Sequence, residues 1–530
     1  MQTKTAPRVV LFLLAAAAVS VAEAQFAIDF DSILSEPMPL VPAALGDFTF
    51  PISSQVPEAQ AYFDQGFQLM YAFGKAEAIR SFRQASALDP NCAICYWGEA
   101  WSWGSYLNGA MTTEEAPHAY AAAQKALALR EHATPREQAY IDALAVRYVA
   151  DYDVERRRDM DEAYALAMRE LAEAYPDDLD AATLYADALF LLEERRGYRD
   201  IEQPRIHYIR TVLEGVLERD IRHAGACHLY IHLTEATEQP ELAEPCAEHI
   251  GTAVPGASHL NHMPSHTWNE VGRWGDSVRA NTRAWHSDLK AAVGEGVAIY
   301  ASHNLHMLLF AASYDGQGAV AMRAAKDFTK QTGSSMLESL VLLRFGRFDE
   351  VLELEMPGSG DYAAGVWEFA QGYARLRADE PEFANAHLLR LARIASTTTA
   401  RVRWDAASEV LRVLEDILRG EILRHEGDLD GAIDALERAA ETEDGLQYDE
   451  PEMLPFAARH WLGAALLEAG RYRAAERVYR EELEDHPHNG WSLFGLRKAL
   501  EARGRTDAAV DADFEASWGR SDVWITASRF

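Results

Sequence analysis

Histidine is concentrated in one part of this sequence. Nine of the 18 histidines lie between positions 228 and 306, a small part of the 530 residues. Most of them are separated by three, four or seven residues, which in a helix places side chains on one face. Glu235 and Glu270 continue this spacing. The candidate site residues are His228, His232, Glu235, His259, His262, His266, His303 and His306, with Glu270 as a neighbour.

This pattern predicts a transition-metal site. Neutral imidazole is the commonest protein metal ligand, and side chains one helical turn apart are about 5–6 Å apart at Cβ, so two rings can reach one ion. Nitrogen and oxygen ligands favour copper, zinc, iron or nickel over calcium and magnesium. Seven imidazoles exceed the four ligands of a tetrahedral ion. Either two ions bind, or one ion binds and the spare histidines contact a substrate.

Other interpretations of the cluster stay open. Adjacent imidazoles repel one another once protonated below about pH 6.5, so the same face also suits a pH-sensitive peptide groove. Accidental enrichment is the third interpretation. The sequence contains no phosphate-binding glycine loop, nucleophile elbow or HExxH helix. Any chemistry would therefore belong to the metal, with Glu235 or Glu270 as the candidate base or as a group that orients the ligands.

The sequence around the cluster predicts helices almost throughout. Alanine, leucine, glutamate and arginine dominate, and apolar residues recur every three or four positions. Self-similarity is visible near the C-terminus, where Gly470 and Gly504 are 34 residues apart, as are Ala475 and Ala509. A fixed period of this length indicates a helical repeat array.

One repeat type fits these intervals. The segment 62–90 carries Gly66, Ala78, Phe82, Ala85 and Pro90 at its characteristic offsets. In this the chain resembles the tetratricopeptide repeat (TPR) family, well over 59–110, 224–330 and 410–520 and more loosely between them. The resemblance implies an all-α fold, an α-solenoid of antiparallel helix pairs wound into a superhelix. It also implies a concave groove lined by the first helix of each pair, which in most members binds a peptide.

The repeat register places the histidines in that groove. Small residues at the helix contacts (Ala243, Ser277, Ala321) and the turn glycines Gly272 and Gly316 put repeat starts at 224, 258 and 302. The resemblance assigns groove-facing side chains to the second, fifth, ninth, twelfth and thirteenth positions. Seven imidazoles and two carboxylates occupy such positions, so three consecutive helices should direct them at one concave patch.

We divide the chain into six segments. Breaks are expected at 355–361 and at 441–451, an acidic stretch that ends in proline. The segments are a signal peptide (1–24), an N-terminal extended arm (25–56), N-terminal helical repeats (57–223), histidine-rich repeats (224–330), central helical repeats (331–445) and C-terminal repeats (446–530).

The first 24 residues resemble a bacterial export signal. Lys4 and Arg8 precede thirteen apolar residues at 9–21, and Ala22-Glu23-Ala24 fits the cleavage pattern. Thirteen residues span about 20 Å of helix, short of the ~30 Å membrane core. We expect cleavage before Gln25 and a periplasmic or secreted protein with no membrane insertion after cleavage.

Charge and cysteines limit the partners further. The net charge of -33 makes nucleic acids and anionic membranes unsuitable partners. Cys92 and Cys95 lack the following histidine of a haem attachment motif, so we expect two small helix residues, with a redox dithiol as the alternative. Cys227 and Cys246 fall on neighbouring helices and are the candidate structural disulfide.

Two hypotheses of function follow. The first is an exported helical-repeat metalloprotein that holds copper, zinc or iron in the histidine cluster, with enzymatic activity left open. The second is a non-catalytic scaffold that binds a protein, peptide or small-molecule ligand in the same groove.

Overall fold

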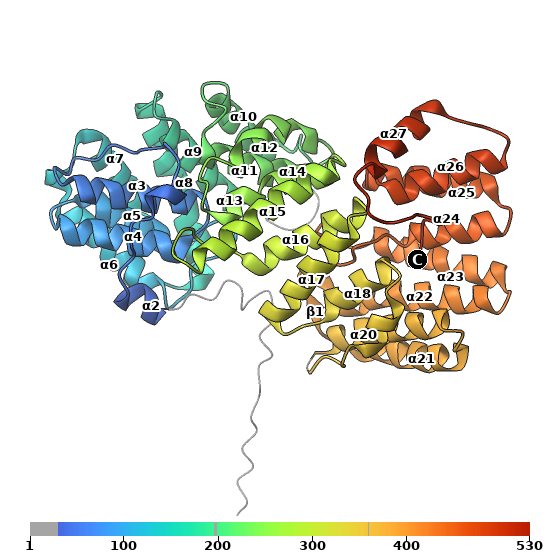
Figure 1. The fold of residues 1–530 in the computed structure, drawn as a ribbon. Coiled ribbons are helices and arrows are strands. Elements are labelled where there is room, and N and C mark those ends of the chain that lie inside the picture. Colours follow the sequence, from blue (N-terminus) through green and yellow to red (C-terminus); the bar gives the residue numbers. More distant parts are fainter. Residues whose placement is uncertain (1–29, 195–198, 359) are drawn as a thin grey trace, which may run out of the picture.

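The chain is built almost entirely of helices (Figure 1). The computed structural model describes residues 30–194, 199–358 and 360–530. Helices account for 68% of these residues, and their only strands are the two-residue β1 (Arg401–Val402) and β2 (Asp405–Ala406), which pair antiparallel. The predicted all-α solenoid is therefore confirmed. The predicted signal peptide lies outside the described residues.

The first half of the solenoid encloses one hydrophobic core, which extends from Ile33 to Ile299. Consecutive helices pack as pairs joined by short turns, as in α3 with α4 and α5 with α6. The elements of this half are α2 (Phe30–Ser35), η1 (Pro42–Ala44), α3 (Pro57–Tyr71), α4 (Lys75–Leu88), α5 (Ala93–Trp103), α6 (Ala116–Ala128), η2 (Arg130–His132), α7 (Pro135–Ala145), η3 (Val154–Arg156), α8 (Arg157–Ala174), α9 (Leu179–Phe190), α10 (Pro204–Leu217), α11 (Ala224–Thr234), η4 (Pro240–Ala243), α12 (Glu244–Ile250), α13 (Ser258–His262), α14 (Pro264–Glu270) and α15 (Trp274–Ala291).

The second half encloses a separate core, from Trp274 to Val510, and α15 and α16 connect the two halves. In Figure 1 it forms the yellow-to-red part of the molecule. Its helices are α16 (Ala301–Tyr314), α17 (Gly318–Thr332), α18 (Met336–Arg344), α19 (Phe348–Glu353), α20 (Asp361–Arg377), α21 (Pro381–Thr397), α22 (Ala407–His425), α23 (Leu429–Asp444), α24 (Arg459–Glu468), α25 (Tyr472–Asp485), α26 (Gly490–Ala502) and α27 (Ala508–Trp518).

The same packing unit occurs near both ends of the solenoid. An aromatic ring on the second helix of a pair lies between two glycines, one on each neighbouring helix. A Cβ added to any of these glycines would come within 2.2 to 2.9 Å of the ring, closer than packed atoms allow. The units are Gly66, Phe82 and Gly98 in α3, α4 and α5, and Gly463, Tyr479 and Gly495 in α24, α25 and α26.

Both cysteine pairs form disulfides. Cys227 and Cys246 join α11 to α12, as expected. The Cys92–Cys95 disulfide corrects our expectation of two small helix residues. Cys92 precedes the first turn of α5 with a non-helical backbone, and its Cα lies 5.4 Å from that of Cys95, which suits a disulfide.

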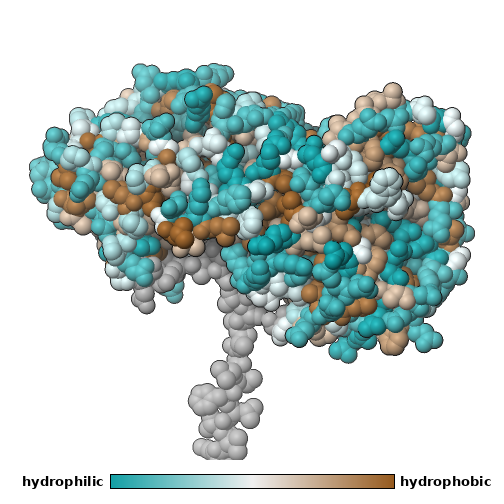
Figure 2. Space-filling model, viewed as in Figure 1, coloured by the Kyte–Doolittle hydropathy of each residue, from teal (hydrophilic) through white to brown (hydrophobic). Residues whose placement is uncertain are grey.

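The surface is predominantly polar. The face shown in Figure 2 is mostly hydrophilic, with hydrophobic residues in small scattered groups. Within the described ranges, no helix combines the length and the apolar character needed to cross a membrane.

Candidate metal centre

Six imidazoles converge where α11, α13, α14 and α16 pack together. The predicted single helix from Ser258 to Glu270 is divided into α13 and α14 at Pro264, because proline has no N–H to continue the helical hydrogen bonds. All but one of the imidazoles are buried, and His303 is half-buried. The converging histidines are His228 and His232 on α11, His259 and His262 on α13, His266 on α14 and His303 on α16.

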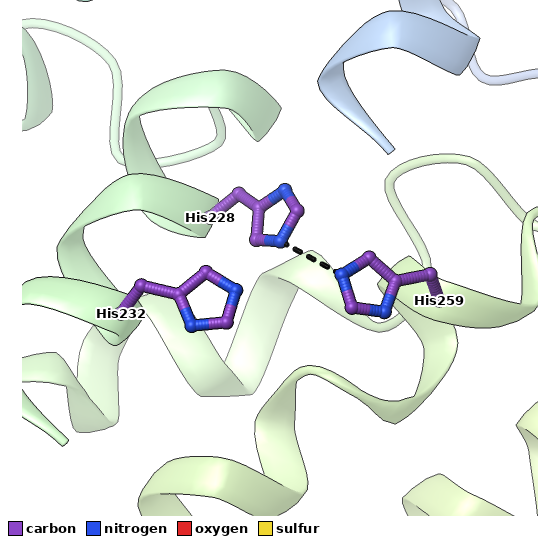
Figure 3. Close-up of side chains that lie close together, drawn as sticks. All are labelled: His228, His232 and His259. Atoms are coloured by element: carbon purple, nitrogen blue, oxygen red, sulfur yellow. Dashed lines mark hydrogen bonds between the residues drawn. The ribbon is translucent and has the colours of Figure 1, made fainter. Parts of the chain in front are cut away.

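The first triad consists of His228, His232 and His259 (Figure 3). Each offers one ring nitrogen, and the three nitrogens lie within 4.8 Å of one another. Nδ1 of His228 donates to the backbone oxygen of Tyr71 at 2.6 Å, so its Nε2 presents a lone pair. That Nε2 lies 3.2 Å from Nε2 of His259. Two nitrogens bound at 2.0–2.1 Å to one tetrahedral ion are about 3.3 Å apart, so this separation suits a shared ion.

The second triad consists of His262, His266 and His303, whose ligand nitrogens also lie within 4.8 Å of one another. Nε2 of His266 is 3.3 Å from Nε2 of His262. The ring centroids of His262 and His303 are 4.8 Å apart. The two triads therefore have similar geometry and lie next to each other, because the rings of His259 and His262 are 4.9 Å apart.

The two triads are related by one repeat. His262 and His266 follow His228 and His232 by 34 residues each. Each triad therefore takes the fifth and ninth positions of one repeat and completes them with the second position of the next, which is His259 or His303. The same local arrangement is thus used twice in succession.

One carboxylate connects the triads. Glu235 accepts a hydrogen bond from Nδ1 of His232 at 2.7 Å and another from Nδ1 of His266. Glu450 lies 2.9 Å from the same nitrogen of His266. Carboxylates in this position orient a ligand ring and fix which nitrogen faces the metal. His232, Glu235, His266 and Glu450 also form a compact group of possible ligands in their own right.

Burial keeps most of these imidazoles neutral. Desolvation, and then the neighbouring histidines, hold the pKa of His259, His262 and His303 below the ordinary value. Burial also lowers the pKa of His266, but the charges of Glu235 and Glu450 outweigh it and raise the pKa to about 9. Neutral imidazole is the form that binds a metal.

Two aromatic residues in strained backbone conformations cover the first triad. Phe73 has a φ of 59° and Tyr300 a φ of 56°, in the left-handed region that bulky residues rarely adopt. The ring of Phe73 lies 4.1 Å from that of His228, and the ring of Tyr300 lies 4.9 Å from that of His259. Strain of this kind clusters at functional sites.

The structure does not bring His306 or Glu270 into these groups. Nδ1 of His306 accepts a hydrogen bond from Arg403 at 3.2 Å, so that lone pair is already used. Burial and the charges of Glu452 and Glu235 raise the pKa of Glu270 to about 8. We therefore leave both residues out of the proposed ligand set.

Two pockets reach the centre. One, which we call the aromatic pocket, has an empty volume of about 320 Å³ and is lined by His228 together with Tyr71, Phe73, Trp101, Tyr106 and Asp187, among others. The other, the acidic pocket, has an empty volume of about 360 Å³. Its lining includes His266, Glu270, Trp274, Glu450, Glu452 and His486.

Sequence reasoning missed the contribution of residues far along the chain. Glu450 comes from the loop after α23, in the stretch that the sequence marks only as an acidic break. Arg403 holds this loop in place through Asp449 at 2.6 Å and the backbone oxygen of Glu450 at 2.8 Å. Neither residue carries a periodic signal that would connect it to the histidines.

Known proteins offer little guidance on this centre. No protein-family model matches the chain, and no curated protein is detectably similar in sequence. Similar solved structures include the human IFIT1 dimer with m7Gppp-AAAA, 11% identical with a TM-score of 0.31 over 80% of this chain and 89% of that one. The yeast Tom70 structure is 12% identical with a TM-score of 0.28, over 88% and 92%. The TPR domain of P58(IPK) is 10% identical with a TM-score of 0.22, over 84% and 98%. Scores this low say nothing about ligands.

Proposed function

We propose that this protein is a helical-repeat metalloprotein that holds two transition-metal ions, one in each histidine triad. The observation that carries the proposal is the repetition of one three-imidazole arrangement after 34 residues, with Glu235 connecting the copies. Imidazole ligands favour copper, zinc or iron.

Three protein ligands leave a position open on each ion. Catalytic zinc sites have this composition, whereas structural sites are closed by four protein ligands. The two pockets beside His228 and His266 are consistent with access to such positions. The centre therefore suits binding of a small molecule at the metal, and the reaction remains to be identified by assay.

Elemental analysis of the purified protein tests the proposal. We expect about two ions per chain, since each triad provides three nitrogens. The double variant His262→Ala with His266→Ala should lose one ion, and His228→Ala with His232→Ala the other. The matched control is His249→Ala with His286→Ala, which lie outside the three groups of possible ligands. A metal-free wild type that cannot be reconstituted would refute the proposal, and one ion per chain would restrict it to a single site.

A scaffold that binds a peptide in its groove is the alternative. The second half of the chain already holds its own last residues in this manner. Ser528 donates a hydrogen bond to the backbone oxygen of His460 at 2.7 Å, and the ring of Phe530 lies 4.8 Å from that of Trp461. This contact supports a peptide-binding capacity there. Metal content separates the two functions.

We also propose that the protein acts after export from the cytoplasm. The basic and apolar start of the chain supports this location, and the two disulfides agree with an oxidising compartment. N-terminal sequencing of protein from an exporting host should begin at Gln25. Retention of Met1 would contradict export by cleavage.

A further inference from the structure

The aromatic pocket is bounded by four helices of the first half, α3, α5, α9 and α11. Four aromatic side chains contribute to its wall, and each is at most 8% exposed. Its volume falls in the range of small-molecule sites, which are mainly apolar with a few well-placed polar groups. The aromatic residues are Tyr71, Phe73, Trp101 and Tyr106.

One buried carboxylate lines this pocket without a partner. Asp187 on α9 is 8% exposed, and within the described part of the chain its carboxylate has no hydrogen bond or ion pair. The nearby cation Arg147 is engaged elsewhere, with its Nε 3.4 Å from Asp161. A buried charge without a partner is costly, so its presence calls for a cation that the protein chain does not supply.

The hydroxyls in the pocket wall cannot take this role. Tyr71 donates its hydroxyl hydrogen to Asp180 at 2.8 Å, and the hydroxyl of Tyr106 is paired with that of Tyr300 at 2.8 Å. Thr183 donates to the backbone oxygen of Leu179 at 2.8 Å. The donor that satisfies Asp187 must therefore come from the molecule that fills the pocket.

We propose that the aromatic pocket binds a small organic ammonium ion. Asp187 would accept hydrogen bonds from the ammonium group, and the ring faces around it would attract the same positive charge. Carboxylate and phosphate ligands are disfavoured, because they would face Asp187 directly. A bound ammonium ion would lie beside the first triad, since His228 lines the same pocket. Binding itself does not depend on the metal.

Matched amines and alcohols test the charge preference. We expect benzylamine or phenethylamine, measured by isothermal titration calorimetry near pH 7.5, to bind the full-length protein at least 10-fold more tightly than benzyl alcohol or 2-phenylethanol. In Asp187→Asn the amine affinity should fall to that of the alcohols. Asp159→Asn removes an exposed carboxylate of α8 and should leave the preference unchanged.

The outcomes are distinct from those of the metal experiment. Failure of both amines to bind the folded wild type, equal affinity for amine and alcohol, or an amine preference retained in Asp187→Asn would each overturn this proposal. A circular dichroism spectrum of each variant confirms that it has folded. Metal content, measured on the same samples, reports separately on the histidine triads.

Discussion

At the scale of single residues, the centre depends on which imidazole nitrogens are available. Tyr71 holds the Nδ1 proton of His228, and Glu235 does the same for His232 and His266. In each case the opposite nitrogen, Nε2, is left to face an ion. His306 shows the contrary case, because Arg403 occupies its Nδ1. Equal spacing in the sequence therefore produces different roles.

Replacing Glu235 with glutamine tests this orientation. The amide can accept a hydrogen bond from one of the two histidines, but its NH₂ group opposes the Nδ1–H of the other. We expect the affinity for zinc to fall by about 10–100-fold, the usual effect of losing such a carboxylate. Competition with a chromogenic chelator measures it. Glu218→Gln, an exposed change just after α10, is the control, and equal affinities in the two variants would contradict the assigned role.

The buried carboxylate of Asp187 predicts a pH dependence of stability. Burial raises its pKa to about 6, above the value near 3.9 expected in the unfolded chain. The folded state therefore keeps this proton over a range where the unfolded state has lost it, so the stabilising contribution present below pH 4 is lost as the pH rises through 6. The shift of about two units corresponds to about 3 kcal/mol at most.

Asp187→Asn should remove that dependence. We expect the variant to match the wild type near pH 4.5 and to melt at a higher temperature at pH 7.5, both without added amine. Thermal unfolding at the two pH values provides the comparison. A variant that is less stable than the wild type at pH 7.5 would show that the carboxylate has a partner under these conditions.

At the scale of elements, the sequence predicts the helices well because their signals are local. Apolar periodicity, small residues and turn glycines lie within one repeat, and they place the three histidine-bearing helices next to one another. The contacts of Glu450 and Arg403 arise only when the second half packs near the first, so no local pattern reveals them. The left-handed backbone of Phe73 has no sequence signal either, since phenylalanine normally avoids it.

Two helical glycines provide opposite predictions. Gly98 on α5 faces the ring of Phe82, which an added Cβ would approach to 2.4 Å, whereas Gly215 on α10 has no atom within 4 Å. We expect Gly98→Ala to lower the melting temperature, because the buried ring cannot move aside. Gly215→Ala should raise it slightly, by about 0.5–1 kcal/mol of helix stability. Circular dichroism melts measure both, and a stabilised Gly98→Ala would mean that the α4–α5 contact is looser than described.

At the scale of the whole molecule, the period of the repeat predicts a solenoid but not its division into two cores. The division falls at α15 and α16, whose side chains contribute to the second core while His303 completes the second triad. The metal centre thus lies close to the junction between the halves. Its occupancy should affect the stability of the entire chain.

Metal removal tests this connection. An ion that binds only the folded state stabilises it by about 4 kcal/mol when its concentration is 1,000 times Kd. We therefore expect chelation to lower the melting temperature by several degrees and readdition of zinc or copper to restore it. The variant His262→Ala with His266→Ala should show a smaller change. Identical melting curves with and without chelator would mean that the ion, if bound, does not favour the folded state.

The repetition of the triad after 34 residues has a consequence for protein engineering. A repeat that carries histidine at its fifth and ninth positions needs only a histidine at the second position of the next repeat to complete a triad. Inserting copies of residues 224–257 or 258–301 in tandem would therefore lengthen the row of triads by whole units, without any newly invented backbone. A natural scaffold of this type is a template for modular arrays of metal ions spaced by the rise of one repeat.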